Sequence, residues 1–297
     1  MRHTTADGSM QMLRTLLILM GVFFVMVILS GSLGSWLSVY FVPESRECYL
    51  LQSAVQAVVG FVATAVITSR LCSTDPKGFL GMRLNPGWRP FVGVVVMYLL
   101  CMPFLNQLIY WNAGMKLPEA FAGVERYMRE MEELNGKISE IILSSDSIGG
   151  MISGVLIIGV LTGFAEEILF RGTLQNALCR NSKIRVWGVW IAAAIFSAVH
   201  LQFFGFFPRL LLGAFFGYLL YSTGSLWPGV FAHALNNSIV VVSMWLQHRD
   251  PTFPDMGMIG VSETGFPLLA TVSLVATVMF IIYGYGYFFK KSKSSWQ

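Results

Sequence analysis

Charged residues are scarce in this sequence. Only 12% of its 297 residues are Asp, Glu, Lys or Arg, whereas 55% are hydrophobic. Soluble domains carry about 25% charged residues, because a surface that faces water needs them. Much of this surface therefore faces something other than water. The net charge of +4 is modest, and the basic residues gather near the ends of apolar runs. This distribution indicates membrane topology rather than nucleic-acid binding.

Cysteine is also scarce, and neither internal repeats nor low-complexity tracts are present. The four cysteines contain no C-x-x-C pair, which favours single buried thiols over a disulfide framework or a metal site. These are Cys48, Cys72, Cys101 and Cys179. The first apolar run extends over about residues 16–37. It exceeds the apolar core of a signal peptide, which is about 7–15 residues long, so we expect a retained membrane helix.

Long apolar runs are abundant. A helix of roughly 20 apolar residues crosses the bilayer core, and these runs are too long and too uniformly apolar for barrel strands. The sequence predicts an all-α polytopic transmembrane helix bundle with about eight transmembrane helices. The predicted spans are 13–36, 50–71, 91–111, 149–175, 187–204, 207–222, 227–247 and 267–289. Eight crossings put both termini on one side, and most of the 20 lysines and arginines fall there. The positive-inside rule makes that side cytoplasmic, in a multi-pass protein of the cell membrane.

The chain divides into three parts of one integrated bundle. Residues 1–148 are expected to hold the N-terminal transmembrane helices and an amphipathic connection, and residues 149–247 the helical core. Residues 248–297 hold the last transmembrane helix and a basic tail. Within the polar connection, 112–147, apolar residues recur at three- and four-residue spacing, which predicts an amphipathic helix on the membrane or on the bundle. The Asn135-Gly136 pair is expected to break this helix.

Ionisable residues inside apolar spans are costly and mark candidate functional sites. The fourth span contains Glu166, Glu167 and Arg171. Glu167 and Arg171 are four residues apart on a helix, so they share a face and can form a buried ion pair. Glu166 points about 140° away from Arg171, because a helix has about 3.6 residues per turn. We therefore expect Glu166 to face another helix and to be free to act as a base.

Two further spans carry histidines. His200 lies in the fifth span, and His233 lies one helical turn before Asn237 in the seventh. Counted from the cytoplasmic ends of their spans, Glu166, His200 and His233 lie at depths of roughly 14, 20 and 9 Å, at about 1.5 Å per residue. These depths are compatible with one wet pocket in the inner half of the membrane.

This set of side chains is suited to hydrolysis. Glu166 can take a proton from water with help from His200, while His233 and Asn237 can stabilise the oxyanion of an attacked carbonyl. An alternative uses the same atoms, because Glu166, His200 and His233 match a three-ligand catalytic zinc site with water in the fourth position. The spacing of these residues does not decide between the glutamate base and the zinc site.

The order of the motifs resembles a known family. The pattern is Glu166-Glu167-x-x-x-Arg171, then Phe196-x-x-x-His200, then His233-x-x-x-Asn237. It resembles the CAAX-protease and bacteriocin-processing (CPBP) family of intramembrane proteases, of the type II CAAX prenyl endopeptidase kind. The resemblance covers about residues 149–247 and implies that this helical core is the catalytic part.

The resemblance implies an eight-helix bundle around a water-filled cavity, and an endopeptidase that acts on a peptide or lipidated-protein substrate near the cytoplasmic leaflet. Eukaryotic members remove the last three residues from prenylated C-termini. By this likeness Glu166 is the general base, His200 its partner, and His233 and Asn237 stabilise the transition state. The supporting residues are Glu167, Arg171 and Phe196. The resemblance favours a glutamate mechanism without a metal over one with zinc.

Two other classes of protein could use the same polar network. One is a proton-coupled transporter, although the spans show no obvious repeated halves and only one carries a pair of carboxylates. The other is a catalytically silent membrane scaffold or immunity protein, in which the buried charges only fix helix packing.

Overall fold

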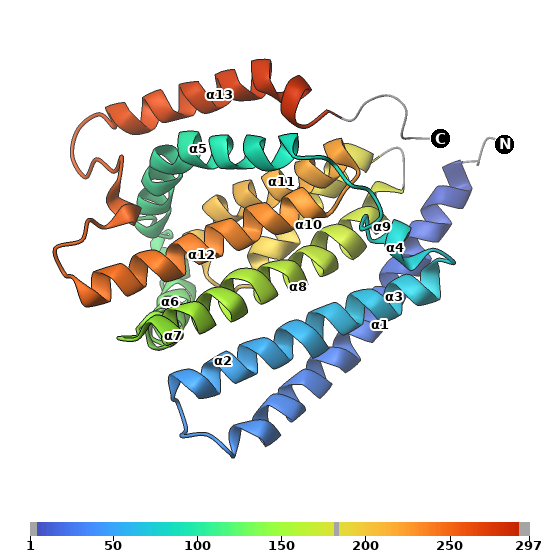
Figure 1. Cartoon of the computed structure of the whole chain (residues 1–297), viewed down its shortest axis with the longest axis horizontal. Helices are drawn as coiled ribbons and strands as arrows, with labels where there is room; N and C mark the ends of the chain where they lie inside the picture. The colour runs from blue at the N-terminus through green and yellow to red at the C-terminus, as the bar shows by residue number, and fades with distance from the viewer. Residues whose placement is uncertain (1–4, 181–183, 291–297) are drawn as a thin grey trace.

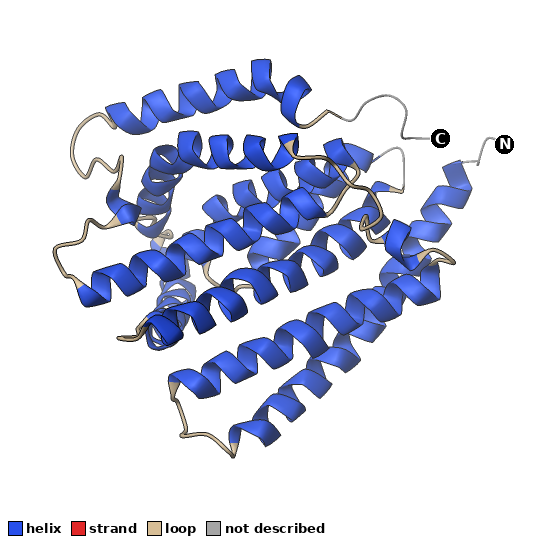
Figure 2. Ribbon diagram, viewed as in Figure 1, coloured by secondary structure: helices blue, strands red, loops and turns tan. Residues whose placement is uncertain are grey.

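The computed structural model describes residues 5–180 and 184–290. Helices make up most of this part of the chain, and it contains no strand (Figures 1 and 2), so the predicted all-α bundle is confirmed. The α-helices are α1 Thr5–Ser38, α2 Arg46–Val55, α3 Ala63–Cys72, α4 Pro76–Phe79, α5 Arg89–Ala113, α6 Ala122–Leu143, α7 Ile148–Gly154, α8 Thr162–Leu169, α9 Asn176–Cys179, α10 Arg185–Ala198, α11 Phe206–Thr223, α12 Trp227–Arg249 and α13 Leu268–Phe288. Single π-helical or 3-10 turns are η1 Gln56–Val62, η2 Glu119–Phe121, η3 Val155–Leu161, η4 Phe170–Gln175, η6 Phe203–Gly205 and η7 Met256–Met258.

Seven helices in the described residues are long and apolar enough to cross a membrane. They correspond to seven of the eight predicted spans. The remaining one, α10, has only 14 residues. At about 1.5 Å per residue it is roughly 21 Å long, less than the roughly 30 Å hydrocarbon core. The first turn of α1 and the last turn of α13 nevertheless lie at the same end of the bundle (Figure 1).

The fifth span is shorter than the predicted 187–204, because α10 ends at Ala198. Leu201 has a φ of 54°, which a helix cannot accommodate, and the chain turns back into α11. The backbone polar groups of this turn form hydrogen bonds with side chains from outside it. Asn112 of α5 donates to the Phe203 carbonyl and accepts from the Phe207 N–H, while Arg209 donates to the carbonyls of residues 202 and 205. Irregular backbone within a membrane needs such internal partners. His200 therefore lies in a braced turn and not within a helix.

Two of the spanning segments contain π-helical stretches: η1 lies in the span 46–72, and η3 and η4 both lie in the span 148–179. Such a stretch displaces carbonyls from the regular hydrogen-bond ladder, and threonine hydroxyls take up two of them. Thr162 donates to the Ile157 carbonyl and Thr173 to the Ile168 carbonyl, each at 2.9 Å. Single π-helical turns inside helices are frequent at functional sites.

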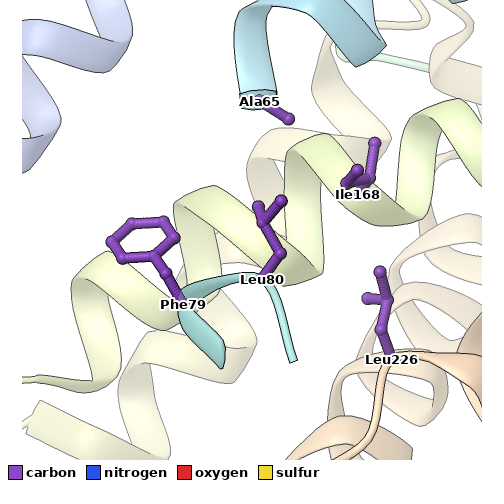
Figure 3. Close-up of a cluster of buried hydrophobic side chains, with 5 residues drawn as sticks. All are labelled: Ala65, Phe79, Leu80, Ile168 and Leu226. Carbon is purple, nitrogen blue, oxygen red and sulfur yellow. The ribbon is translucent and has the colours of Figure 1, made fainter. Parts of the chain in front are cut away.

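A compact apolar cluster fixes the end of the bundle nearest to α4 (Figure 3). It brings together Ala65 of α3, Phe79 of α4, Ile168 of α8, and Leu80 and Leu226 from the connections that follow α4 and precede α12. The Leu226 N–H also donates to the Gly81 carbonyl, at 2.8 Å. Ile168 follows Glu167 directly, so this packing holds the helix that carries both glutamates against the start of α12.

The amphipathic helix α6 is continuous from Ala122 to Leu143, so the predicted break at Asn135-Gly136 is wrong. The Asn135 side chain donates to the Met131 carbonyl of the preceding turn, and the helix tolerates Gly136 at a cost of about 1 kcal/mol. At the other end, Glu125 accepts from the Leu117 N–H and from Arg129, which lowers the pKa of its carboxyl. Arg129 also covers the Phe204 ring at 4.3 Å, which ties α6 to the turn after α10.

Candidate active site

The core of the site is an ion pair between Glu167 of α8 and Arg171 of η4. Glu167 Oε1 and Arg171 Nη1 are 2.8 Å apart, and both side chains are almost completely buried. The ion pair predicted from the four-residue spacing is thus confirmed. Arg171 also donates to the Gly213 carbonyl of α11 and lies 4.3 Å above the Phe196 ring. These contacts compensate for the cost of burying its charge.

His233 of α12 joins this pair on its other side. Its Nδ1 lies 2.9 Å from Glu167 Oε1, and its ring stacks on Phe216 and meets the Phe196 ring at 89°. A carboxylate accepts hydrogen bonds, so Nδ1 carries a proton and Nε2 holds the lone pair of the neutral ring. Nε2 lies 3.5 Å from Glu166 Oε2. His233 therefore connects the two adjacent glutamates.

Small residues allow α8 and α12 to come this close. A Cβ on Gly163 would lie 3.1 Å from the Ala234 backbone nitrogen, and one on Gly159 would lie 2.4 Å from the Ser238 hydroxyl. On the facing helix, a Cβ on Gly229 would lie 3.0 Å from Glu167 Oε2. The short side chains leave room for the Glu167–His233 hydrogen bond to form between the helices.

Glu166 and His200 line one cavity of about 220 Å³. The side chain of Glu166 is 13% exposed, in contrast to the fully buried Glu167. His200 Nδ1 lies 2.8 Å from the Phe196 carbonyl, which can only accept, so in the neutral ring Nε2 is again the acceptor. The Phe196 ring also packs against the His200 ring, at 5.0 Å between centroids. The two carboxylates thus differ in their surroundings, and Glu166 is the one that faces open space.

Asn237 lies one turn after His233 on α12, as expected, but it does not line this cavity. Its amide donates to the Ile158 carbonyl of η3 at 3.3 Å and accepts from Asn236. Ile158 itself lines the cavity. Asn237 thus ties α12 to the π-helical wall, and the structure assigns it no contact with Glu166 or His200.

The motifs did not predict the opposite wall of the cavity. Ser53 of α2 and Gln56 and Phe61 of η1 line it, all from the N-terminal half, for which the sequence predicted only helices. One signal was available. Gln56 is a polar residue within the apolar run 50–71. Phe216 of α11, which stacks on His233, carried no comparable signal.

The alternative set of zinc ligands was Glu166, His200 and His233. Across residues 5–180 and 184–290, no group of three or more His, Cys, Asp or Glu side chains is arranged to hold a metal ion. No step of the mechanism is therefore assigned to zinc.

A membrane peptidase is the class of protein that the comparisons support. Residues 149–239 match the family described as type II CAAX prenyl endopeptidase Rce1-like, so the predicted family resemblance is confirmed. The matched segment contains all seven site residues named from the motifs: Glu166, Glu167, Arg171, Phe196, His200, His233 and Asn237.

Two relatives come from Bacillus subtilis (strain 168). The chain is 24% identical to "Putative membrane peptidase YdiL" over 200 residues, which cover 66% of this chain and 74% of that protein. It is 27% identical to "Uncharacterized protein YpbD" over 118 residues, covering 38% of this chain and 56% of that protein. No solved structure matches the chain.

Proposed function

We propose that this protein is an intramembrane endopeptidase in which Glu166 activates water for attack on a peptide bond. One observation carries the proposal. Glu166 faces a cavity shared with His200, while the adjacent Glu167 is fully buried and engaged with Arg171 and His233. Two neighbouring carboxylates in different surroundings suit different tasks, one of acid–base chemistry and one of support.

In the proposed reaction, Glu166 takes a proton from water while the water oxygen bonds to the carbonyl carbon of the substrate. The carbonyl electron pair moves to its oxygen, which becomes an oxyanion. The C–N bond then breaks as the carbonyl re-forms, and the proton held by Glu166 passes to the leaving nitrogen. His200 Nε2 is an acceptor in the neutral ring and can orient the attacking water.

His233 has a second task in this scheme. His233 Nε2 lies 3.5 Å from Glu166 Oε2 and thus close to the proposed base. In the imidazolium form both ring nitrogens of His233 donate, Nδ1 to Glu167 and Nε2 to the oxyanion. By the family resemblance, the second hydrogen of Asn237 Nδ2 is the other proposed donor.

The family resemblance supports a substrate at the cytoplasmic leaflet, a peptide or a lipidated protein, with both termini of the enzyme in the cytoplasm. Residues 1–148, 149–247 and 248–297 form one integrated bundle in this proposal. The contact of α8 with η1 across the cavity supports the union of the first two parts.

The deciding experiment compares membranes that hold the wild-type protein with membranes that hold Glu166→Ala or His200→Ala variants. We expect a protein whose terminus changes only with the wild type, found by quantitative mass spectrometry of protein ends. Both variants must give wild-type thermal unfolding in detergent. Full cleavage by the folded Glu166→Ala variant would defeat the proposal. Solute flux in liposomes that Glu166→Gln abolishes, with no cleavage, would support the transporter instead.

A further inference from the structure

Gln56 is a polar side chain in the middle of a membrane span. It is the first residue of η1 and lies ten residues after Arg46, where the span 46–72 begins. Its side chain is exposed and lines the cavity that also holds Glu166 and His200. It comes from outside the matched segment, residues 149–239.

The amide of Gln56 has no hydrogen-bond partner in the described part of the chain, unlike the amides of Gln52 and Gln107 in the spans. Gln52, one turn earlier, donates to the Ser38 hydroxyl at 3.0 Å, and Gln107 accepts from the Ser262 N–H at 2.7 Å. An amide that faces apolar surroundings without a partner costs roughly 1–3 kcal/mol by mutational data. Within a membrane span, the cavity is where Gln56 can find that partner.

The other side chains of this wall are either apolar or have their hydrogen-bonding groups already paired. Ser53 lies one turn before Gln56, and its hydroxyl donates to the Tyr49 carbonyl. Phe61, Phe170 and Ile158 supply apolar surface around the same cavity. Gln56 therefore provides a free N–H donor and a free carbonyl acceptor, across from the proposed base.

We propose that Gln56 positions the substrate by hydrogen-bonding the peptide backbone beside the bond to be cleaved. In an extended chain the N–H and C=O of one residue point to the same side, so a single amide can pair with both. Nε2 donates to the peptide carbonyl and Oε1 accepts the peptide N–H, while the apolar wall accommodates side chains. The N-terminal helices thus form the substrate-binding side of the site. This inference rests on the proposed function.

The test uses an internally quenched peptide that carries the cleaved sequence found by the comparison of protein ends. Gln56→Leu keeps the volume and removes both hydrogen bonds. We expect KM to rise about tenfold or more with kcat within about twofold, because the lost binding is present before and during the reaction. Gln52→Leu is the matched control, since Gln52 lies on the same face one turn away but does not line the cavity. It should leave both constants unchanged.

A second measurement distinguishes a direct hydrogen bond between Gln56 and the substrate from an effect of Gln56 on helix packing. Replacing the peptide N–H near the cleaved bond by an ester oxygen should lower kcat/KM with wild-type enzyme about tenfold at one position. The same replacement should not lower kcat/KM further in Gln56→Leu, because that variant already lacks the partner of the peptide N–H. Equal losses in both enzymes would overturn the inference, as would unchanged KM in Gln56→Leu. Either result leaves the proposed function intact if Glu166→Ala abolishes cleavage, whereas cleavage by Glu166→Ala defeats the proposed function itself.

Discussion

A single carboxylate oxygen, Glu167 Oε1, lies 2.9 Å from His233 Nδ1 and 2.8 Å from Arg171 Nη1. This relationship determines which nitrogen of His233 carries the proton and directs the other nitrogen towards Glu166. It also gives the buried Arg171 its counter-charge. The adjacent glutamates therefore differ in their surroundings, because the helix turns one of them into a buried network and the other into the cavity.

Glu167→Gln should destabilise the protein strongly. The amide leaves the Arg171 charge without compensation at a fully buried position, a change that costs about 3–5 kcal/mol. Glu166→Gln should instead unfold near the wild-type temperature and lose cleavage, because the Glu166 side chain is partly exposed to the cavity. Thermal unfolding in detergent and cleavage of the quenched peptide measure the two effects. Equal unfolding temperatures for the two variants would contradict this division of roles.

Gly163→Ala should impair cleavage by moving α12 away from α8. The added Cβ would lie 3.1 Å from the Ala234 nitrogen and 3.3 Å from its Cα, and backbone cannot rotate away as a flexible side chain can. Overpacking of this kind costs about 1–3 kcal/mol, and a displacement of about 1 Å near the chemistry can cost about a hundredfold in rate.

Gly31→Ala is the control for this variant. Nothing lies within 4 Å of the Cβ it would add to α1. It should leave cleavage unchanged and stabilise the helix by up to about 1 kcal/mol. If Gly163→Ala behaved in the same way, close approach of the two helices would not be what assembles the site.

The sequence was sufficient to predict the spans and the pairing of charges. Seven of the eight apolar runs correspond to helices that can cross a membrane, because a long apolar run has few other stable conformations in lipid. The Glu167–Arg171 pair followed from helix geometry alone, since a spacing of four puts both residues on one face in any α-helix.

The turn after α10 could not be predicted in the same way. It depends on Asn112, which precedes Phe203 by 91 residues, and on the left-handed backbone at Leu201. The π-helical stretches depend on how helices pack side by side, which the local sequence does not encode. For the same reason the sequence placed Gln56 on a helix but could not place it across a cavity from Glu166.

Asn237→Ala should lower kcat by about tenfold or more while KM changes little. The proposed oxyanion donor is lost, and removal of one such donor costs about 10²–10³ in kcat where the donor is fully engaged. The substitution also removes the hydrogen bond to the Ile158 carbonyl, which predicts a small loss of stability of about 1 kcal/mol. Steady-state kinetics and thermal unfolding measure the two effects. A loss of stability with unchanged kcat would show that Asn237 only holds α12 against η3.

Cleavage should survive removal of metal. In the proposed mechanism the proton of the attacking water passes to Glu166, and the two histidines hold their positions through Glu167 and the Phe196 carbonyl rather than through a metal. Purified protein treated with a zinc chelator and then dialysed should therefore keep its kcat, with zinc below about a tenth of an equivalent by mass spectrometry of the metal. Addition of zinc should not raise the rate. Loss of activity on chelation, restored by one equivalent of zinc, would instead support Glu166, His200 and His233 as ligands, because an imidazole–carboxylate set of three leaves the fourth position for water.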